Sequence, residues 1–204
     1  MLMIISGAFG IFKRNIFSAI GKFDKDTMTE DFDLALKIRK RKGKIKFARD
    51  SIARTYCPNN WKAWKVQRRR WAHGHISTLY KHRDMLLSSR FTKKDRVGQA
   101  DMWLMDVILV FVFWFSPIVF VPYLILKTLE GDGHIIIYTL AMIFLIYLAA
   151  ETIIFLYAVY SSRKWSNLKL IYLIPVVAFG YRILLKFIVL QGYFKAIRGK
   201  KIGW

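Results

Sequence analysis

Three long apolar blocks in the second half of the chain constrain its fold more than any other feature. They run approximately over residues 102–126, 134–160 and 168–194, and they consist mostly of Leu, Ile, Val, Phe and Tyr. A helix of about 20 apolar residues is long enough to cross a bilayer, and buried core helices rarely run that long without charges. The sequence therefore predicts a membrane protein whose first two apolar blocks are spans.

The third block is ambiguous. Pro175, Gly180, Arg182 and Lys186 interrupt its apolar sequence. A full third span would also carry the basic residues after residue 194 to the outer side, although Lys and Arg favour the cytoplasmic side. A re-entrant path and a path in the plane of the interface both stay open for this segment.

Positive charge is concentrated before the apolar blocks. Residues 1–100 hold 24 Lys and Arg against 8 Asp and Glu, and so carry +16 of the total charge of +21. Such an excess suits nucleic acid or anionic lipid headgroups. Because nucleic-acid domains do not end in three membrane-length segments, we expect membrane lipids as partners and no nucleic acid. The positive-inside bias places this basic half in the cytoplasm.

Carboxylates gather where the sequence predicts a helix to begin, after Thr27. Thr27 and Glu30 have capping-box spacing, and Glu30 and Asp31 complement the positive end of a helix dipole. A carboxylate held there is a candidate general base. Most acids at such positions only stabilise the helix, and that alternative holds for this tripeptide taken alone.

A second candidate group lies on a basic, aromatic helix predicted over residues 61–87. Gln67, Arg70 and Trp71 are spaced i, i+3 and i+4, so they share one face. Arg70 can grip diphosphate oxygens with its guanidinium fork, and Trp71 offers a flat surface on which a sugar ring can stack. A Trp and Arg belt at the membrane interface, with no catalytic role, is the alternative.

Four stretches together resemble the membrane-embedded family 2 glycosyltransferases, which include the cellulose, chitin, hyaluronan and poly-N-acetylglucosamine synthases. Residues 5–14 resemble the family's SGAFGxFRR element and residues 29–34 its TEDxDL motif. Residues 67–74 resemble QRxRWxxG, and residues 198–204 are similar to a basic RGKKxGW tail. The order, the spacing and the flanking apolar segments all agree with that family.

The resemblance implies roles by position. Asp31 would be the catalytic base, Gln67 and Arg70 would bind the donor diphosphate, and Trp71 would form the acceptor platform. Further motif residues would lie near the acceptor or support the site: Ser6 and Gly7 for the acceptor, and Thr29, Glu30 and Asp33 for support.

The resemblance also implies a fold. We expect an α/β plus membrane-helical protein, with the back half of a GT-A domain in residues 1–56. Within it, residues 2–5 and the alternating residues 44–48 are predicted to form short strands. Interfacial amphipathic helices with the QxxRW motif and a basic linker would occupy residues 57–100. A transmembrane bundle with a basic tail would occupy residues 101–204. The family's first half, with its nucleotide site and its DxD metal motif, is not recognisable, so the chain looks like a carboxy-terminal half.

Metal ligands are expected in that preceding half and none in this chain. The family uses Mg²⁺ or Mn²⁺. Asp24 and Asp26 have the DxD pattern but lie on the wrong side of the Ser-Gly stretch, and we interpret them as loop acids. His73 and His75 are two residues apart and do not share a helix face, which argues against zinc.

We therefore expect an inverting transferase that adds a sugar, N-acetylglucosamine by resemblance, from a UDP-sugar to a β-linked polysaccharide. It would be a multi-pass protein of the plasma membrane with its catalytic part in the cytoplasm, and an accessory membrane subunit is a possible partner. Two alternatives stay open: a non-processive transferase that glycosylates a lipid, and a membrane-anchored fragment without catalysis of its own.

Overall fold

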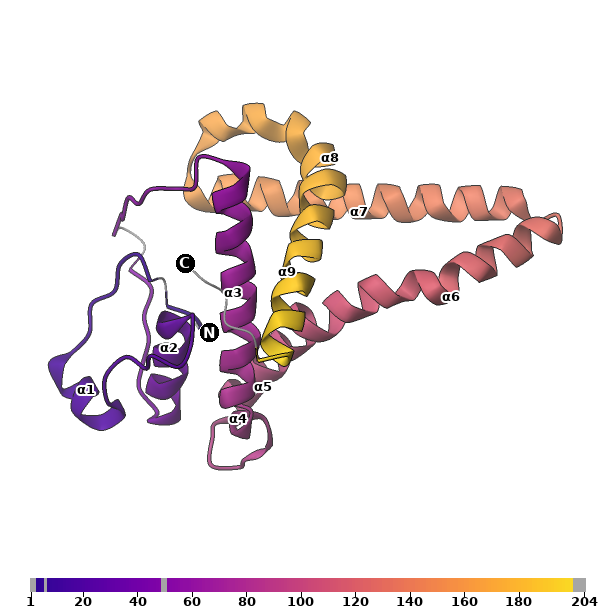
Figure 1. Ribbon diagram of the computed structural model, residues 1–204. Coiled ribbons are helices and arrows are strands. Elements are labelled where there is room, and N and C mark those ends of the chain that lie inside the picture. The colour runs from indigo at the N-terminus through magenta and orange to yellow at the C-terminus, as the bar shows by residue number, and fades with distance from the viewer. Residues whose placement is uncertain (1–2, 6, 49–50, 200–204) are drawn as a thin grey trace. The chain divides into compact units, whose positions relative to one another are not determined.

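The computed structural model describes residues 3–5, 7–48 and 51–199, and all regular structure in these residues is helical (Figure 1). The chain forms two compact units. The first contains the residues up to Phe111 together with those from Ile188 onward, and the second runs from Val112 to Phe187.

The first unit carries the polar helices. They are α1 (Arg14–Ile20), α2 (Glu30–Lys40), α3 (Trp61–Lys81), α4 (Asp84–Leu87), α5 (Lys93–Met102) and the π-helix η1 (Trp103–Ile108). Helices α2 and α3 lie side by side (Figure 1). Their contact forms the core of this unit, where Phe32, Leu34, Leu36 and Leu79 are at most 2% exposed. Helix α2 therefore lies in the core, although it also carries many charges.

The start of α2 differs from the sequence prediction. The helix begins at Glu30 and not at Thr27. The Thr27 hydroxyl accepts the Thr29 N–H at 3.1 Å and bonds the Thr78 hydroxyl of α3 at 2.9 Å. Thr27 is thus engaged in a tight turn and in a contact with α3, and these bonds take the place of a capping box.

Helix α3 begins as the sequence predicts. The Asn60 side chain accepts the Ala63 N–H at 2.8 Å and caps the helix. The prediction that the helix reaches residue 87 is wrong, because α3 ends at Lys81 and α4 is separate. Gly74 lies within α3 and does not interrupt it.

The expected strands are not seen. Neither residues 3–5 nor residues 44–48 are assigned to a strand. A strand exists only where its backbone bonds a neighbouring strand, and no described segment offers either stretch that pairing. The α/β part of the expected fold class is therefore not confirmed, whereas the membrane-helical part is supported.

The apolar blocks form long helical segments. They contain α6 (Leu109–Leu129), α7 (Gly133–Ser162), the 3₁₀-helix η2 (Trp165–Leu173), α8 (Ile174–Val176), the π-helix η3 (Val177–Tyr181) and α9 (Arg182–Ile197). Three continuous segments are long and apolar enough to cross a membrane: Lys93–Leu129, Gly133–Ser162 and Trp165–Ile197. The third block, ambiguous from sequence, thus meets the same criteria of length and composition as the other two.

An ion pair joins two of these segments within the second unit. Arg182 Nη2 donates to Glu151 Oε2 at 2.7 Å, and Glu151 is only 9% exposed. Charged side chains at bilayer depth are costly unless they are paired. The pair therefore explains how α7 and α9 tolerate these charges inside apolar sequence.

Candidate functional site

The Asp31 carboxylate lies at the start of α2, against the glycine of the first motif. Its Oδ1 accepts the Phe32 N–H at 2.8 Å, which fixes the side chain at the helix N-terminus. A Cβ added to Gly7 would lie 2.8 Å from Asp31 Oδ2, so the Asp31 carboxylate would have to shift if residue 7 carried a side chain. Two motifs that are 24 positions apart in the sequence therefore meet at the carboxylate. Ser6, the other predicted acceptor residue, lies outside the described residues.

The second and third motifs pack directly on one another. A Cβ on Gly74 would lie 2.8 Å from Thr29 Oγ1 and 2.9 Å from the Thr29 backbone nitrogen. The Thr29 hydroxyl also bonds the Thr78 hydroxyl at 3.2 Å. Because residue 74 is glycine, the chain just before α2 can approach α3 closely. The TED motif therefore packs against the helix that carries Gln67, Arg70 and Trp71.

Asp33 anchors α2 from its buried side. Its carboxylate is 1% exposed, and Oδ1 accepts a hydrogen bond from His82 Nε2 at 2.7 Å. Lys81 Nζ lies 3.0 Å from the same oxygen, and Lys37 Nζ lies 3.4 Å from Oδ2. The expected supporting role of Asp33 now has specific partners. Glu30, by contrast, is exposed at the first position of the helix.

Asp33 and Lys81 belong to an ion network in which each charged group stabilises the charged form of its partner. Burial opposes ionisation of Asp33, but hydrogen bonds from His82 and Lys81 outweigh it and hold its pKa well below the usual value of 3.8. Burial likewise opposes protonation of Lys81, yet its bonds to Asp24, Asp26 and Asp33 raise the pKa of its ammonium group above 10.5. Asp33 and Lys81 are therefore both charged at neutral pH.

Asp24 and Asp26 are engaged by the same network. Lys81 Nζ lies 2.6 Å from Asp24 Oδ2 and 3.0 Å from Asp26 Oδ1. Hydrogen bonds from Lys37 and from Lys81 lower the pKa of the Asp24 carboxyl. Both carboxylates therefore have ammonium partners in this structure. Within the described residues, no group of three metal-ligating side chains is found.

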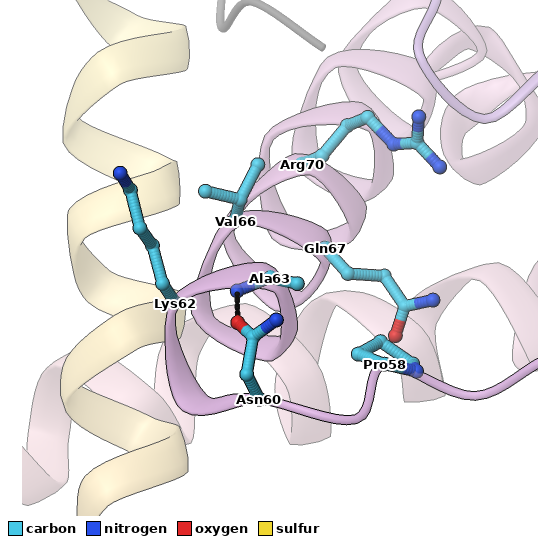
Figure 2. Close-up of a pocket in the computed structure, with 7 residues that line it drawn as sticks. All are labelled: Pro58, Asn60, Lys62, Ala63, Val66, Gln67 and Arg70. Carbon is cyan, nitrogen blue, oxygen red and sulfur yellow. Dashed lines mark hydrogen bonds between the residues drawn. The ribbon is translucent and has the colours of Figure 1, made fainter.

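Gln67 and Arg70 line an open groove of about 500 Å³ at the start of α3 (Figure 2). The volume is in the range of small-molecule sites. In Figure 2 the Gln67 side chain extends toward Pro58, and Arg70 follows one turn later on the helix. The groove is lined by Pro58, Asn60, Lys62, Ala63, Val66, Gln67 and Arg70. The predicted sharing of one helix face by Gln67 and Arg70 is thus seen.

Trp71 lies outside the lining of this groove. Trp71 is 44% exposed, and the Arg68 guanidinium lies 4.2 Å from the centroid of its ring. A cation over one face leaves the remaining exposed part of the ring for other contacts. Trp61 and Trp64 stack on each other, with ring centroids 4.8 Å apart, about two to three turns earlier on the helix. Trp61, Trp64 and Arg68 therefore form one aromatic and cationic row along α3, and Trp71 ends it.

Sequence reasoning did not identify the residues that hold α2 against α3. His82, Lys81 and Thr78 contact the motif residues, and His75 stacks on Phe32 with ring centroids 5.0 Å apart. These residues follow Gly74 along α3 at i+1, i+4, i+7 and i+8. That helical spacing was the signal available, but nothing in one sequence said which helix they would face.

Comparison with known families identifies the family of this chain. A family model described as Glycosyl transferase family group 2 matches residues 1–185. The match covers most of the chain, and the chain therefore belongs to that family of glycosyltransferases. Neither the curated proteins nor the solved structures yielded a match. The predicted class, a transferase with a sugar donor and an acceptor, is confirmed.

Proposed function

We propose that this glycosyltransferase acts at the cytoplasmic face of the plasma membrane. In this proposal it transfers N-acetylglucosamine from a UDP-sugar to a growing β-linked polysaccharide, with inversion at the sugar carbon. The observation that carries the proposal is the meeting of Gly7, Asp31, Thr29 and Gly74, which joins the base motif to the helix of the diphosphate motif.

Each residue has a chemical role in the proposal. The Asp31 carboxylate takes the proton from the acceptor hydroxyl as that oxygen attacks the sugar carbon. The Arg70 guanidinium and the Gln67 amide hold the departing diphosphate, where negative charge develops. Trp71 holds the acceptor ring on its exposed part. The family's metal ligands are expected outside these residues, and no step here depends on them.

The alternatives lead to different products. A non-processive transferase would add one or a few sugars to a lipid, and gel filtration of the product would reveal short, lipid-linked material. An inactive membrane-anchored fragment would neither bind nor turn over donor. Titration of the 204 residues with UDP-sugar and Mg²⁺ or Mn²⁺ by calorimetry addresses that case, and we expect no tight site because the resemblance places the nucleotide pocket elsewhere.

The test of the proposal is Asp31→Asn in the full-length protein, assayed in membranes for polymer synthesis and for donor hydrolysis. The substitution keeps the shape and removes the base. Turnover should fall by about 10²–10⁴-fold, while the KM for UDP-sugar stays nearly unchanged because proton abstraction is felt in the transition state.

Trp71→Ala in the same membranes separates acceptor from donor chemistry. It should reduce polymer extension more than it reduces hydrolysis of the donor by water, since water needs no stacking platform.

For the first variant, polymer synthesis by Asp31→Asn at the rate of the unmodified protein would show that Asp31 is not the base.

A further inference from the structure

Asp31 and Asp33, two of the three carboxylates in residues 29–34, have different roles because their side chains point in different directions. Asp31 and Asp33 are two residues apart on α2, and at about 100° per residue their side chains diverge by about 200°. Asp33 is 1% exposed and faces α3, whereas Asp31 is partly exposed and faces Gly7. The rotation of α2 about its axis therefore sets both positions at once.

His82 forms a hydrogen bond with the buried carboxylate of Asp33. It follows the last residue of α3, is 4% exposed, and its backbone N–H donates to the Thr78 carbonyl oxygen at 3.0 Å. Its Nε2 lies 2.7 Å from Asp33 Oδ1. Because an ionised carboxylate only accepts, the Nε2 atom carries the hydrogen in this bond. The bond is short, buried and directional.

Neighbouring helices hold His82 itself in place. Gln99 of α5 is fully buried and donates to the His82 carbonyl oxygen at 3.5 Å. Asp95 of the same helix lies 3.7 Å from Arg39 Nη1 of α2. The imidazole thus projects from a fixed point between α3 and α5 toward α2. A ring in that position can fix α2 in rotation, which apolar packing alone does weakly.

We propose that His82 is a positioning residue, which holds the base Asp31 in register with Gly7 through its hydrogen bond to Asp33. The inference rests on the proposed role of Asp31 for its catalytic meaning. The positional claim, however, concerns only where residue 31 lies. It can be tested without any sugar transfer.

The test uses a disulfide between positions 7 and 31 as a ruler. A Cβ on Gly7 would lie 3.6 Å from the Asp31 Cβ, within the roughly 3.5–4.5 Å that disulfides require. A chain with Cys57→Ser, Gly7→Cys and Asp31→Cys should therefore crosslink rapidly under mild oxidation. The rate is measured by peptide mass on the purified chain, after circular dichroism has verified its helix content.

Variants of His82 are compared in that chain. His82→Leu removes the hydrogen bond at similar volume, and we expect crosslinking slower by on the order of tenfold, because disulfide formation tolerates little displacement. His82→Gln should restore the rate, since its amide nitrogen reaches the position of Nε2. His134→Leu, at an exposed position early in α7, is the matched control and should leave the rate unchanged.

A second pair keeps the test decisive if His82→Leu does not fold. The amide nitrogen of His82→Asn occupies the place of Nδ1 and does not reach Asp33, so His82→Asn should crosslink slowly and His82→Gln rapidly. Equal rates for these two variants, or an unchanged rate in folded His82→Leu, would overturn the proposal. In full-length protein, His82→Asn should lower kcat with little change in donor KM, and His82→Gln should recover it.

Discussion

At the scale of single residues, side chains that belong to the same motif lie in different environments. Asp31 lies against Gly7, Asp33 is buried in the ion network, and Glu30 is exposed. Trp71 is outside the groove that Gln67 and Arg70 line. Residues 29–34 thus contain a candidate base, Asp31, and a buried anchor, Asp33. Residues 67–71 contain the polar pair of the groove and, separately, the aromatic surface of Trp71.

A first prediction concerns the groove. Arg70→Lys should raise the KM for UDP-sugar by roughly tenfold in full-length protein, because an ammonium cannot reproduce the bidentate fork and charged hydrogen bonds contribute about 1.5–3 kcal/mol. Steady-state kinetics in membranes measures it. Arg41→Lys, at an exposed position after α2, is the control. An unchanged KM in Arg70→Lys would remove Arg70 from the donor site.

At the scale of helices, the pairing of α2 with α3 determines the site. It combines the contact of Thr29 with Gly74, the stack of Phe32 on His75 and the charges around Asp33. Apolar burial stabilises the pair, and the polar contacts determine its register. Both effects can be measured separately by the following two substitutions.

Gly74→Ala should destabilise the first unit. The added methyl would lie 2.6 Å from Thr29 Cγ2 and 2.9 Å from backbone nitrogen, and such overpacking costs about 1–3 kcal/mol. The midpoint of thermal unfolding in detergent should fall. Gly180→Ala is the matched control, since nothing lies within 4 Å of a Cβ there. A midpoint for Gly74→Ala equal to that of the control would show that the two motifs are not packed this closely.

Acid should weaken the same pairing through Asp33. Because its pKa is lowered on folding, its contribution is present above the unfolded value of 3.8 and is lost as pH falls below that value. Asp33→Asn should therefore cost about 3–5 kcal/mol at neutral pH and less at low pH. Thermal midpoints of both proteins across pH 3 to 7 measure the difference. A constant difference over that range would contradict the ionised network.

At the scale of the whole molecule, membrane-length helices follow a basic first half. All three apolar segments meet the criteria of length and composition for spans. The pairing of Glu151 with Arg182 accounts for two of the charges within the apolar sequence. The side of the membrane on which each loop lies stays a prediction of the positive-inside bias.

Labelling tests that topology. In a Cys57→Ser background, Glu130→Cys between α6 and α7 should react with an impermeant maleimide added outside intact cells. Lys62→Cys on α3 is exposed and should react only after the cells are opened, which makes it the control for sidedness. Reaction of Glu130→Cys only from the cytoplasmic side would invert the proposed orientation.

The sequence by itself determined the class of protein, the membrane-length segments and the residues of the motifs. Such features are local: apolar run length, helical spacing and short motifs all lie within a few neighbouring positions. The helix carrying Gln67, Arg70 and Trp71 was predictable for that reason.

Only the tertiary structure decided what holds Asp31. The partners of its helix lie about 50 positions away, at Thr78, Lys81 and His82. Their identity depends on which faces of α2 and α3 meet, and one sequence does not specify that. The strands expected at residues 2–5 and 44–48 are not seen among the described residues, and a sequence alone could not settle them, because strand formation depends on a pairing partner that lies elsewhere in space.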